Sequence, residues 1–97
     1  MRQSTQLGNL RKDFRGRLRE SPRALALLDA LFVNPYLTTT RASNELGVSL
    51  PTAREAIRTL QAVGMVRPTD DRAWRRLYVA QPILDAIEQP FIEYEDE

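Results

Sequence analysis

The stretch NELGVSLPTAREAIRTLQAVGMV, Asn44 to Val66, contains two helical patterns separated by only a few residues. The first pattern ends in Leu-Gly-Val-Ser, in which Gly47 can take the left-handed conformation that ends a helix and Ser49 can cap the next one. The second pattern runs from Leu50 to about Ala62 and ends before Gly64. Two short helices joined by so tight a turn predict a helix-turn-helix.

The outward face of the second helix is the candidate reading surface. In this motif the first helix packs across the second, which then projects a face of a size that fits the major groove of DNA. Small residues at Ser43 and Ala53 permit the two helices to cross closely. The same outward face is also typical of a solvated helix surface, so that alternative stays open. The residues on it are Thr52, Arg54, Glu55, Arg58 and Thr59.

Upstream of this motif the sequence predicts two further helices. From Leu7 to about Glu20, apolar residues recur at steps of three and four, which indicates a helix with one apolar stripe. Ser21-Pro22 is typical of a cap and first residue of a helix, which extends to about Val33 and is apolar almost all round. Tyr36-Leu37 is a short extended piece, and Thr38 should cap the first helix of the motif. The stripe consists of Leu7, Leu10, Phe14 and Leu18.

Downstream, the period of the pattern changes. Met65–Arg67 and Trp74–Val79 are short β-like segments joined by a turn-rich link, which predicts a hairpin. A hairpin directly after the second helix is the wing of a winged helix, and a last helix follows over Gln81–Glu88. The predicted fold is therefore mainly α with a small β-hairpin (α+β), a winged helix-turn-helix with an extra N-terminal helix. The wing residues that suit phosphates or a minor groove are Arg72, Arg75 and Arg76.

The composition excludes several kinds of site. The 97 residues suffice for one domain, and they include no Cys and no His. Disulfide frameworks, thiolate zinc sites and histidine-based acid–base chemistry are thereby excluded. We expect no catalytic residue, no metal and no cofactor. No apolar run approaches the roughly 20 residues that span a bilayer, so we expect a cytoplasmic protein with no membrane partner.

The two signs of charge are segregated along the chain. The net charge is only +1, yet residues 81–97 carry six acids and no base, which leaves residues 1–80 with a net charge of +7. Of the 14 bases, 13 are Arg, whose planar fork suits phosphate or carboxylate. A genome that prefers Arg codons would explain Arg over Lys equally well, but it would not explain the segregation.

Residues 10–88 also resemble the winged-helix domain at the C-terminus of bacterial Fic-family proteins. The resemblance is carried by LLDALFVNPYLTTTRASNELGVSLPTAREAIRTLQAVGMV, residues 27–66, and RRLYVAQPILDAIE, residues 75–88. Trp74 stands where the family pattern usually has an Arg, which puts a wing contact at that position in doubt. The matching positions are Asn34-Pro35, Thr38, Leu46 to Ser49, Thr52-Ala53, Ile57 to Leu60, Gly64 to Val66 and Trp74 to Ala80.

Fic-family enzymes typically transfer AMP from ATP to a protein hydroxyl, using the motif His-Pro-Phe-x-x-Gly-Asn-Gly-Arg. This motif is absent and the chain has no His, so the resemblance implies an accessory domain that is not itself an enzyme. It also implies a catalytic Fic domain as a partner in cis, with the basic helix Leu7–Glu20 resembling the linker between the two.

The sequence thus predicts an N-terminal linker helix at 1–20, a winged helix-turn-helix at 21–90 and an acidic tail at 91–97. We expect a transcriptional-regulator-like module that binds double-stranded DNA. The alternative is a protein–protein module that docks a Fic catalytic domain, its target or a second copy of itself as a homodimer. An exposed apolar patch of Leu50, Pro51 and Val63 would favour that alternative. The candidate DNA contacts are Thr38, Ser49, Leu50, Thr52, Arg54, Glu55, Arg58, Arg72, Arg75 and Arg76.

Overall fold

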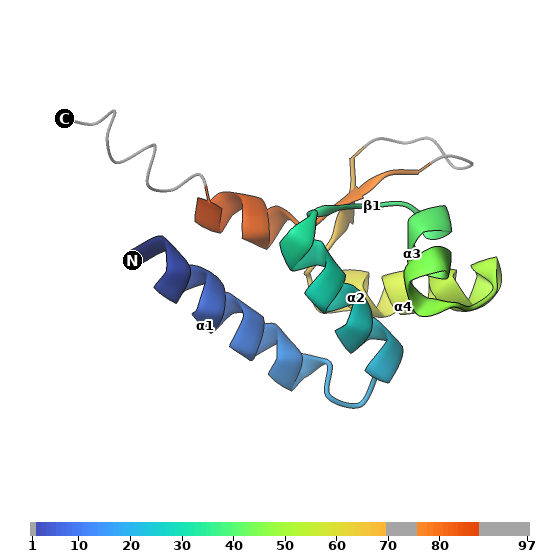
Figure 1. Ribbon diagram of the computed structural model, residues 1–97, viewed down its shortest axis with the longest axis horizontal. Helices are drawn as coiled ribbons and strands as arrows, with labels where there is room; N and C mark the ends of the chain where they lie inside the picture. The colour runs from blue at the N-terminus through green and yellow to red at the C-terminus, as the bar shows by residue number, and fades with distance from the viewer. Residues whose placement is uncertain (1, 70–75, 88–97) are drawn as a thin grey trace.

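Five helices and a small sheet make up the described part of the chain (Figure 1). The computed structural model describes residues 2–69 and 76–87, with side chains from residue 7 onward. A further helix, which follows the last strand, covers residues 81–87. The other elements are α1 Arg2–Arg17, α2 Pro22–Val33, β1 Tyr36–Leu37, α3 Thr39–Leu46, α4 Leu50–Ala62, β2 Arg67–Pro68 and β3 Tyr78–Val79.

The first helix is shifted relative to its prediction. The pattern placed it from Leu7 to about Glu20, whereas α1 begins at Arg2 and ends at Arg17. Residues 2–6 contain neither Pro nor Gly, so nothing in them prevents the helix from starting early. At the other end, the N–H of Leu18 donates to the carbonyls of both Phe14 (3.0 Å) and Arg15 (3.3 Å), which tightens the last turn.

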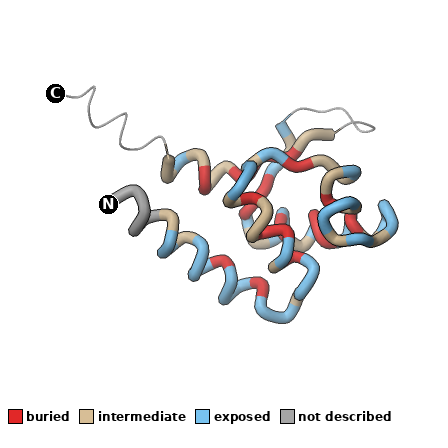
Figure 2. Tube along the Cα trace, viewed as in Figure 1, coloured by how far each residue is buried: buried red, intermediate tan, exposed pale blue. Residues whose placement is uncertain are grey.

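The core is built around α2, as the apolar pattern predicted (Figure 2). Leu27, Leu28 and Leu31 have no exposed surface. The predicted stripe packs on this same core. Phe14 is 5% exposed, Leu18, just after α1, is 1% exposed, and the remaining two leucines of the stripe are partly buried against the core. The apolar stripe is therefore largely covered by the chain's own domain.

Two arginines fasten α1 to α2 across the surface of this packing. Arg11 approaches the carboxylate of Asp29 to 2.9 Å and Arg15 approaches it to 3.1 Å. A third arginine, Arg17, donates to the carbonyl of Val63 at the end of α4 (3.3 Å) and pairs with Asp13 (3.0 Å). Arg11, Arg15 and Arg17 are thus used within the fold.

The turn between α3 and α4 confirms the predicted caps. Thr38 accepts from the backbone N–H of Arg41 (3.1 Å), and Gly47 has a φ of 68°. The N–H groups of Gly47 and Val48 both donate to the backbone carbonyl of Ser43 (2.8 and 3.2 Å). The side-chain hydroxyl of Ser43 donates in turn to the carbonyl of Val48 (2.5 Å). Ser43 therefore organises the turn in addition to permitting close packing.

The remaining caps follow the prediction with one exception. Ser49 caps α4 through the N–H of Thr52, and Gly64, with a φ of 85°, follows its C-terminus. Ser21 occupies the N-cap position of α2, yet its side chain makes no capping hydrogen bond, contrary to the prediction. Its backbone has φ −127° and ψ 84°. The start of α2 is therefore set by the proline that follows.

The wing region contains three strands instead of the predicted two. The sheet is antiparallel with the order β1-β3-β2, and Tyr36 pairs with Val79 while Arg67 also pairs with Val79. Each strand is two residues long. The strand β1 has the bounds of the predicted extended piece, whereas β2 and β3 are shorter than predicted, and Pro68 lacks the N–H that a longer ladder would need. The fold is a winged helix-turn-helix with an extra N-terminal helix, which confirms the predicted fold class.

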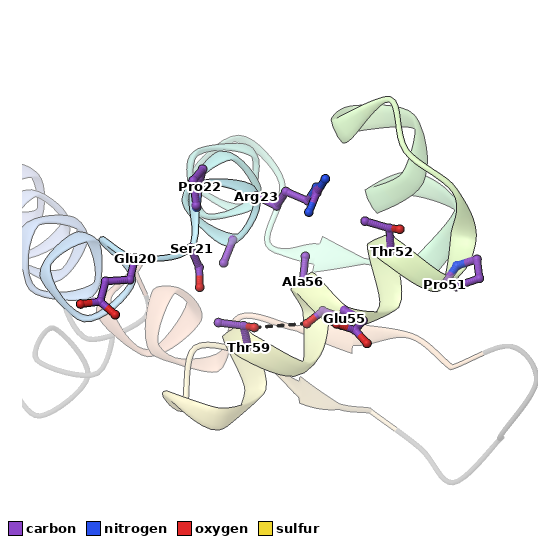
Figure 3. A pocket seen from close by; sticks show the side chains of 10 residues that line it. Glu20, Ser21, Pro22, Arg23, Pro51, Thr52, Glu55, Ala56 and Thr59 are labelled. Atoms are coloured by element: carbon purple, nitrogen blue, oxygen red, sulfur yellow. Dashed lines mark hydrogen bonds between the residues drawn. The ribbon is translucent and has the colours of Figure 1, made fainter.

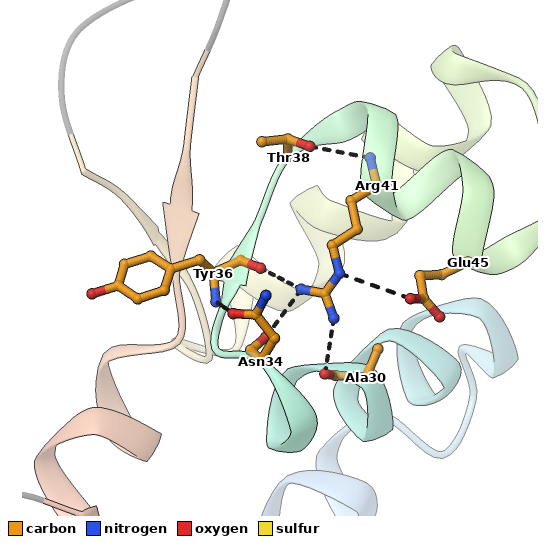
Figure 4. Close-up of polar contacts among 6 residues, drawn as sticks. All are labelled: Ala30, Asn34, Tyr36, Thr38, Arg41 and Glu45. Carbon is orange, nitrogen blue, oxygen red and sulfur yellow. Dashed lines mark hydrogen bonds and ion pairs between the residues drawn. The ribbon is translucent and has the colours of Figure 1, made fainter.

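Arg41 joins the helix-turn-helix to the sheet (Figure 4). Its guanidinium donates to the carbonyls of Ala30 (3.1 Å) and Asn34 (3.0 Å) at the end of α2, and to the carbonyl of Tyr36 in β1. Its Nε lies 3.8 Å from the carboxylate of Glu45 on α3. The carbonyl of Ala30 already accepts from the N–H of Asn34 (3.1 Å), so Arg41 adds a second donor there. Arg41 thereby ties the end of α2 to α3 and β1.

Candidate nucleic-acid interface

The helix α4 separates a buried face from an exposed one, as predicted. Arg54, Glu55 and Arg58 are exposed, and Thr52 and Thr59 are half-buried. At about 100° per residue, Arg58 and Glu55 lie near the outermost line of the helix, while the two threonines lie on one flank. The buried face consists of Ala53, Ala56, Ile57 and Leu60.

The two arginines of this exposed face have no anionic partner within the described residues. Neither Arg54 nor Arg58 forms an ion pair there, in contrast to Arg11 and Arg15 on α1. A guanidinium keeps its charge at any physiological pH and can donate two parallel hydrogen bonds to a phosphate or to the edge of a guanine. The chemistry of this face therefore suits the duplex.

The first turn of α4 contains a chain of hydrogen bonds. The hydroxyl of Ser49 accepts from the N–H of Thr52 (3.4 Å) and donates to the hydroxyl oxygen of Thr52 (3.1 Å). Ser49 is thus engaged at both its donor and its acceptor, and Leu50 beside it is 46% exposed. Thr38, at the start of α3, is half-buried and serves as a cap.

The wing is described only at its base. Arg76, just before β3, is half-buried, whereas Arg72, Arg75 and Trp74 lie outside the described residues, as does the acidic tail. On β2, Arg67 donates to the side-chain oxygen of Gln81 (2.8 and 3.1 Å), which ties that strand to the helix over residues 81–87.

A hollow of about 540 Å³ lies between the start of α2 and the flank of α4 (Figure 3). Its charged lining residues are Arg23, Glu20 and Glu55. Arg23 does not stand out in the sequence, because its place beside α4 depends on how two helices distant in sequence pack together. The hollow is lined by residues 20–24 and by Pro51, Thr52, Glu55, Ala56 and Thr59.

The apolar residues at the two ends of α4 do not form a common patch. Leu50 and Pro51 are exposed at its start, and Val63 is half-buried at its end. Thirteen residues of helix separate Leu50 from Val63, which is about 20 Å along the axis. The condition that would have favoured protein docking at this face is therefore not met.

A model of the IclR helix-turn-helix domain matches residues 22–70, which is just over half of the chain. The chain belongs to this family. The matched region runs from the start of α2 through the helix-turn-helix to β2, so it contains the exposed face of α4. This IclR-type domain is a DNA-binding, transcription-regulator-like module, a kind of domain that is typically not enzymatic. No curated protein matches the chain.

The described part of this IclR-type domain contains neither a membrane-spanning helix nor a cluster of metal ligands. Within residues 2–69 and 76–87, no helix is both long and apolar enough to cross a membrane. The same residues contain no group of three or more acidic, His or Cys side chains that could hold a metal ion. The exposed face of α4 and the adjoining hollow are thus the features on which a function can be built.

Proposed function

We propose that the chain binds double-stranded DNA by laying the outer face of α4 in the major groove. The observation that carries this is the pair of exposed arginines, Arg54 and Arg58, which lie one turn apart and have no anionic partner among the described residues. Arg58, close to the outermost line of the helix, is the proposed base-edge contact. Leu50 and Glu55 complete the face, as candidates for a thymine methyl and for a cytosine amino group.

The wing supplies phosphate contacts in this proposal. Arg72, Arg75 and Arg76 would reach the backbone beside the groove, and Thr38, Ser49 and Thr52 would lie near phosphates at the two helix starts. Four to six phosphates neutralised by arginine side chains would give a log affinity that falls with log salt at a slope of roughly −4 to −5.

Fluorescence anisotropy titrations of labelled duplex DNA at several salt concentrations test the proposal. Arg76→Ala should weaken binding to all sequences about equally and flatten the salt slope by about one unit. Arg58→Ala should weaken binding to a preferred site only. An absence of binding by the parent chain at low salt would overturn the proposal.

We also propose that this DNA-binding module is the accessory domain of a bacterial Fic-family protein. This rests on the sequence resemblance over residues 10–88 and on the absence of the transferase motif. If it holds, the isolated chain should incorporate no label from ATP into protein acceptors in the presence of a divalent metal. Transfer by rigorously purified protein would contradict the accessory role.

A protein partner is the second candidate, favoured by exposed apolar side chains. Val33 is 86% exposed, and Tyr36 and Leu50 are 43% and 46% exposed. A catalytic Fic domain in cis, its target or a second copy of this chain could bind there. Light scattering over a wide concentration range tests the homodimer, and a strictly monomeric chain would exclude it.

A further inference from the structure

We propose that Arg23 and Thr52 together bind one phosphate of the DNA backbone in the hollow between α2 and α4. This contact rests on the proposed DNA-binding function and adds to it a backbone contact that the wing does not supply. It assigns a role to Arg23, which lies in the first turn of α2, far from α4 in the sequence.

The position of Arg23 is the first observation. Its side chain is exposed and extends from α2 toward the N-terminal turn of α4, where Thr52 lies (Figure 3). Glu20 and Glu55 line the same hollow, yet neither forms an ion pair with Arg23. The guanidinium of Arg23 is therefore not held by a direct ion pair and is available to an incoming anion.

The hydroxyl of Thr52 is the second observation. Its oxygen accepts a hydrogen bond from the hydroxyl of Ser49 (3.1 Å), so its own proton is left to donate to another acceptor. Thr59, further along the same flank, differs because its hydroxyl already donates to the carbonyl of Glu55 (3.2 Å). The hollow thus offers a charged donor and a hydroxyl donor at the same end.

The chemistry of these two groups selects an anionic acceptor with several oxygens. When α4 lies in the major groove, the acceptor that runs along the edge of the groove is the phosphate backbone. The two carboxylates restrict where it can sit. Glu20 lies at the far end of the hollow from Thr52 (Figure 3), and Glu55 would oppose a phosphate placed deeper along α4. The phosphate therefore belongs at the end of the hollow that Arg23 and Thr52 line.

The test compares three single variants of the full chain in DNA titrations at several salt concentrations. Arg23→Gln should flatten the salt slope by about 0.9, the effect of losing one phosphate contact. Thr52→Val, which keeps the shape of the side chain, should weaken binding roughly three- to tenfold, the value of one hydrogen bond. Lys12→Gln is the control, because Lys12 is an exposed cation on α1 and its loss changes the net charge equally.

The double variant supplies the second criterion. If both groups hold the same phosphate, Arg23→Gln combined with Thr52→Val should cost less than the two single effects added together. Equal salt slopes for Arg23→Gln and Lys12→Gln would overturn the shared contact while leaving DNA binding itself intact. A parent chain that fails to bind DNA at low salt would overturn both proposals. Thermal melts establish that each variant is folded.

Discussion

The arginines of α1 and those of α4 are chemically identical but are used differently. On α1, Arg11 and Arg15 converge on the carboxylate of Asp29, and Arg17 pairs with Asp13 and donates to a backbone carbonyl of α4's last turn. On α4, Arg54 and Arg58 have no anionic partner within the described residues. A count of basic residues would treat both helices as candidate DNA surfaces.

The difference shows that the position of nearby carboxylates decides which arginines remain unpaired and can bind DNA. Asp29 lies on the face of α2 that α1 covers, so Arg11 and Arg15 are paired within the fold. The buried face of α4, by contrast, consists of Ala and aliphatic side chains, and its exposed face carries a single acid, Glu55. On the exposed face of the helix-turn-helix, positive charge without a local partner is the part of the basic excess that we expect to act on DNA.

The largest expected effect comes from breaking the docking of α1. Phe14 is 5% exposed and packs in the core, so Phe14→Ala should reduce the free energy of unfolding by about 3–5 kcal/mol. Urea denaturation followed by circular dichroism measures this. Lys12→Ala, on the exposed side of the same helix, should change stability by less than about 0.5 kcal/mol. Equal stabilities for the two variants would mean that α1 is not part of the core.

The next effect tests the α4 side of the comparison. Arg58→Ala should cost about 1–3 kcal/mol of binding free energy on a preferred DNA site and little on random sequence, because a base-edge contact is lost. Arg15→Ala is the matched control, since Arg15 is already paired with Asp29. The measurement is a competition titration of both variants against specific and random duplexes. Equal losses of DNA affinity for the two variants would contradict the distinction between arginines paired within the fold and unpaired arginines that bind DNA.

The helical part of the fold could be predicted because its signals are local. Gly47 and Ser49 make their capping hydrogen bonds with residues only three or four positions away. The sequence pattern therefore located the end of α3 and the start of α4 correctly. The segment of β1 was predicted as a short extended piece, but its place in the sheet was not, because it pairs with β3 some forty residues later. So short a segment carries no periodicity.

The candidate site was predictable to the same extent. The exposure of Arg54 and Arg58 follows from helical periodicity, which is why the sequence identified that face. The engagement of Arg41 with the end of α2, and the position of Arg23 beside α4, depend on tertiary packing between separate elements. Sequence spacing does not specify which carbonyl or hydroxyl a long side chain will reach, so these two arginines were missed.

A smaller effect should follow from releasing the arginines of α1. Asp29→Asn removes the carboxylate shared by Arg11 and Arg15, whose side chains are 46% and 49% exposed. Exposed pairs contribute about 0.2–1 kcal/mol each, so stability should fall by about 1 kcal/mol or less. If α1 lies away from the duplex, DNA affinity should stay within about twofold of the parent. Titration and denaturation of this variant check the two expectations, and a large gain in affinity would place α1 on the DNA.

The smallest effect concerns the acidic tail. A chain that stops at Pro90 lacks Glu93, Glu95, Asp96 and Glu97, which carry the same sign as the DNA backbone. Removal of the tail should tighten DNA binding a few-fold at about 10 mM salt, where charges act over about 30 Å. At 150 mM salt, where charges act over about 8 Å, the affinity should change little. A full-length variant with those four acids changed to Gln or Asn separates charge from length, and should match the shortened chain. Equal affinities of parent and shortened chain at low salt would refute the repulsion. An equal gain in affinity at both salt concentrations would mean that the tail opposes binding sterically. The unpaired arginines of α4 would then be unaffected by the acids at the C-terminal end of the chain.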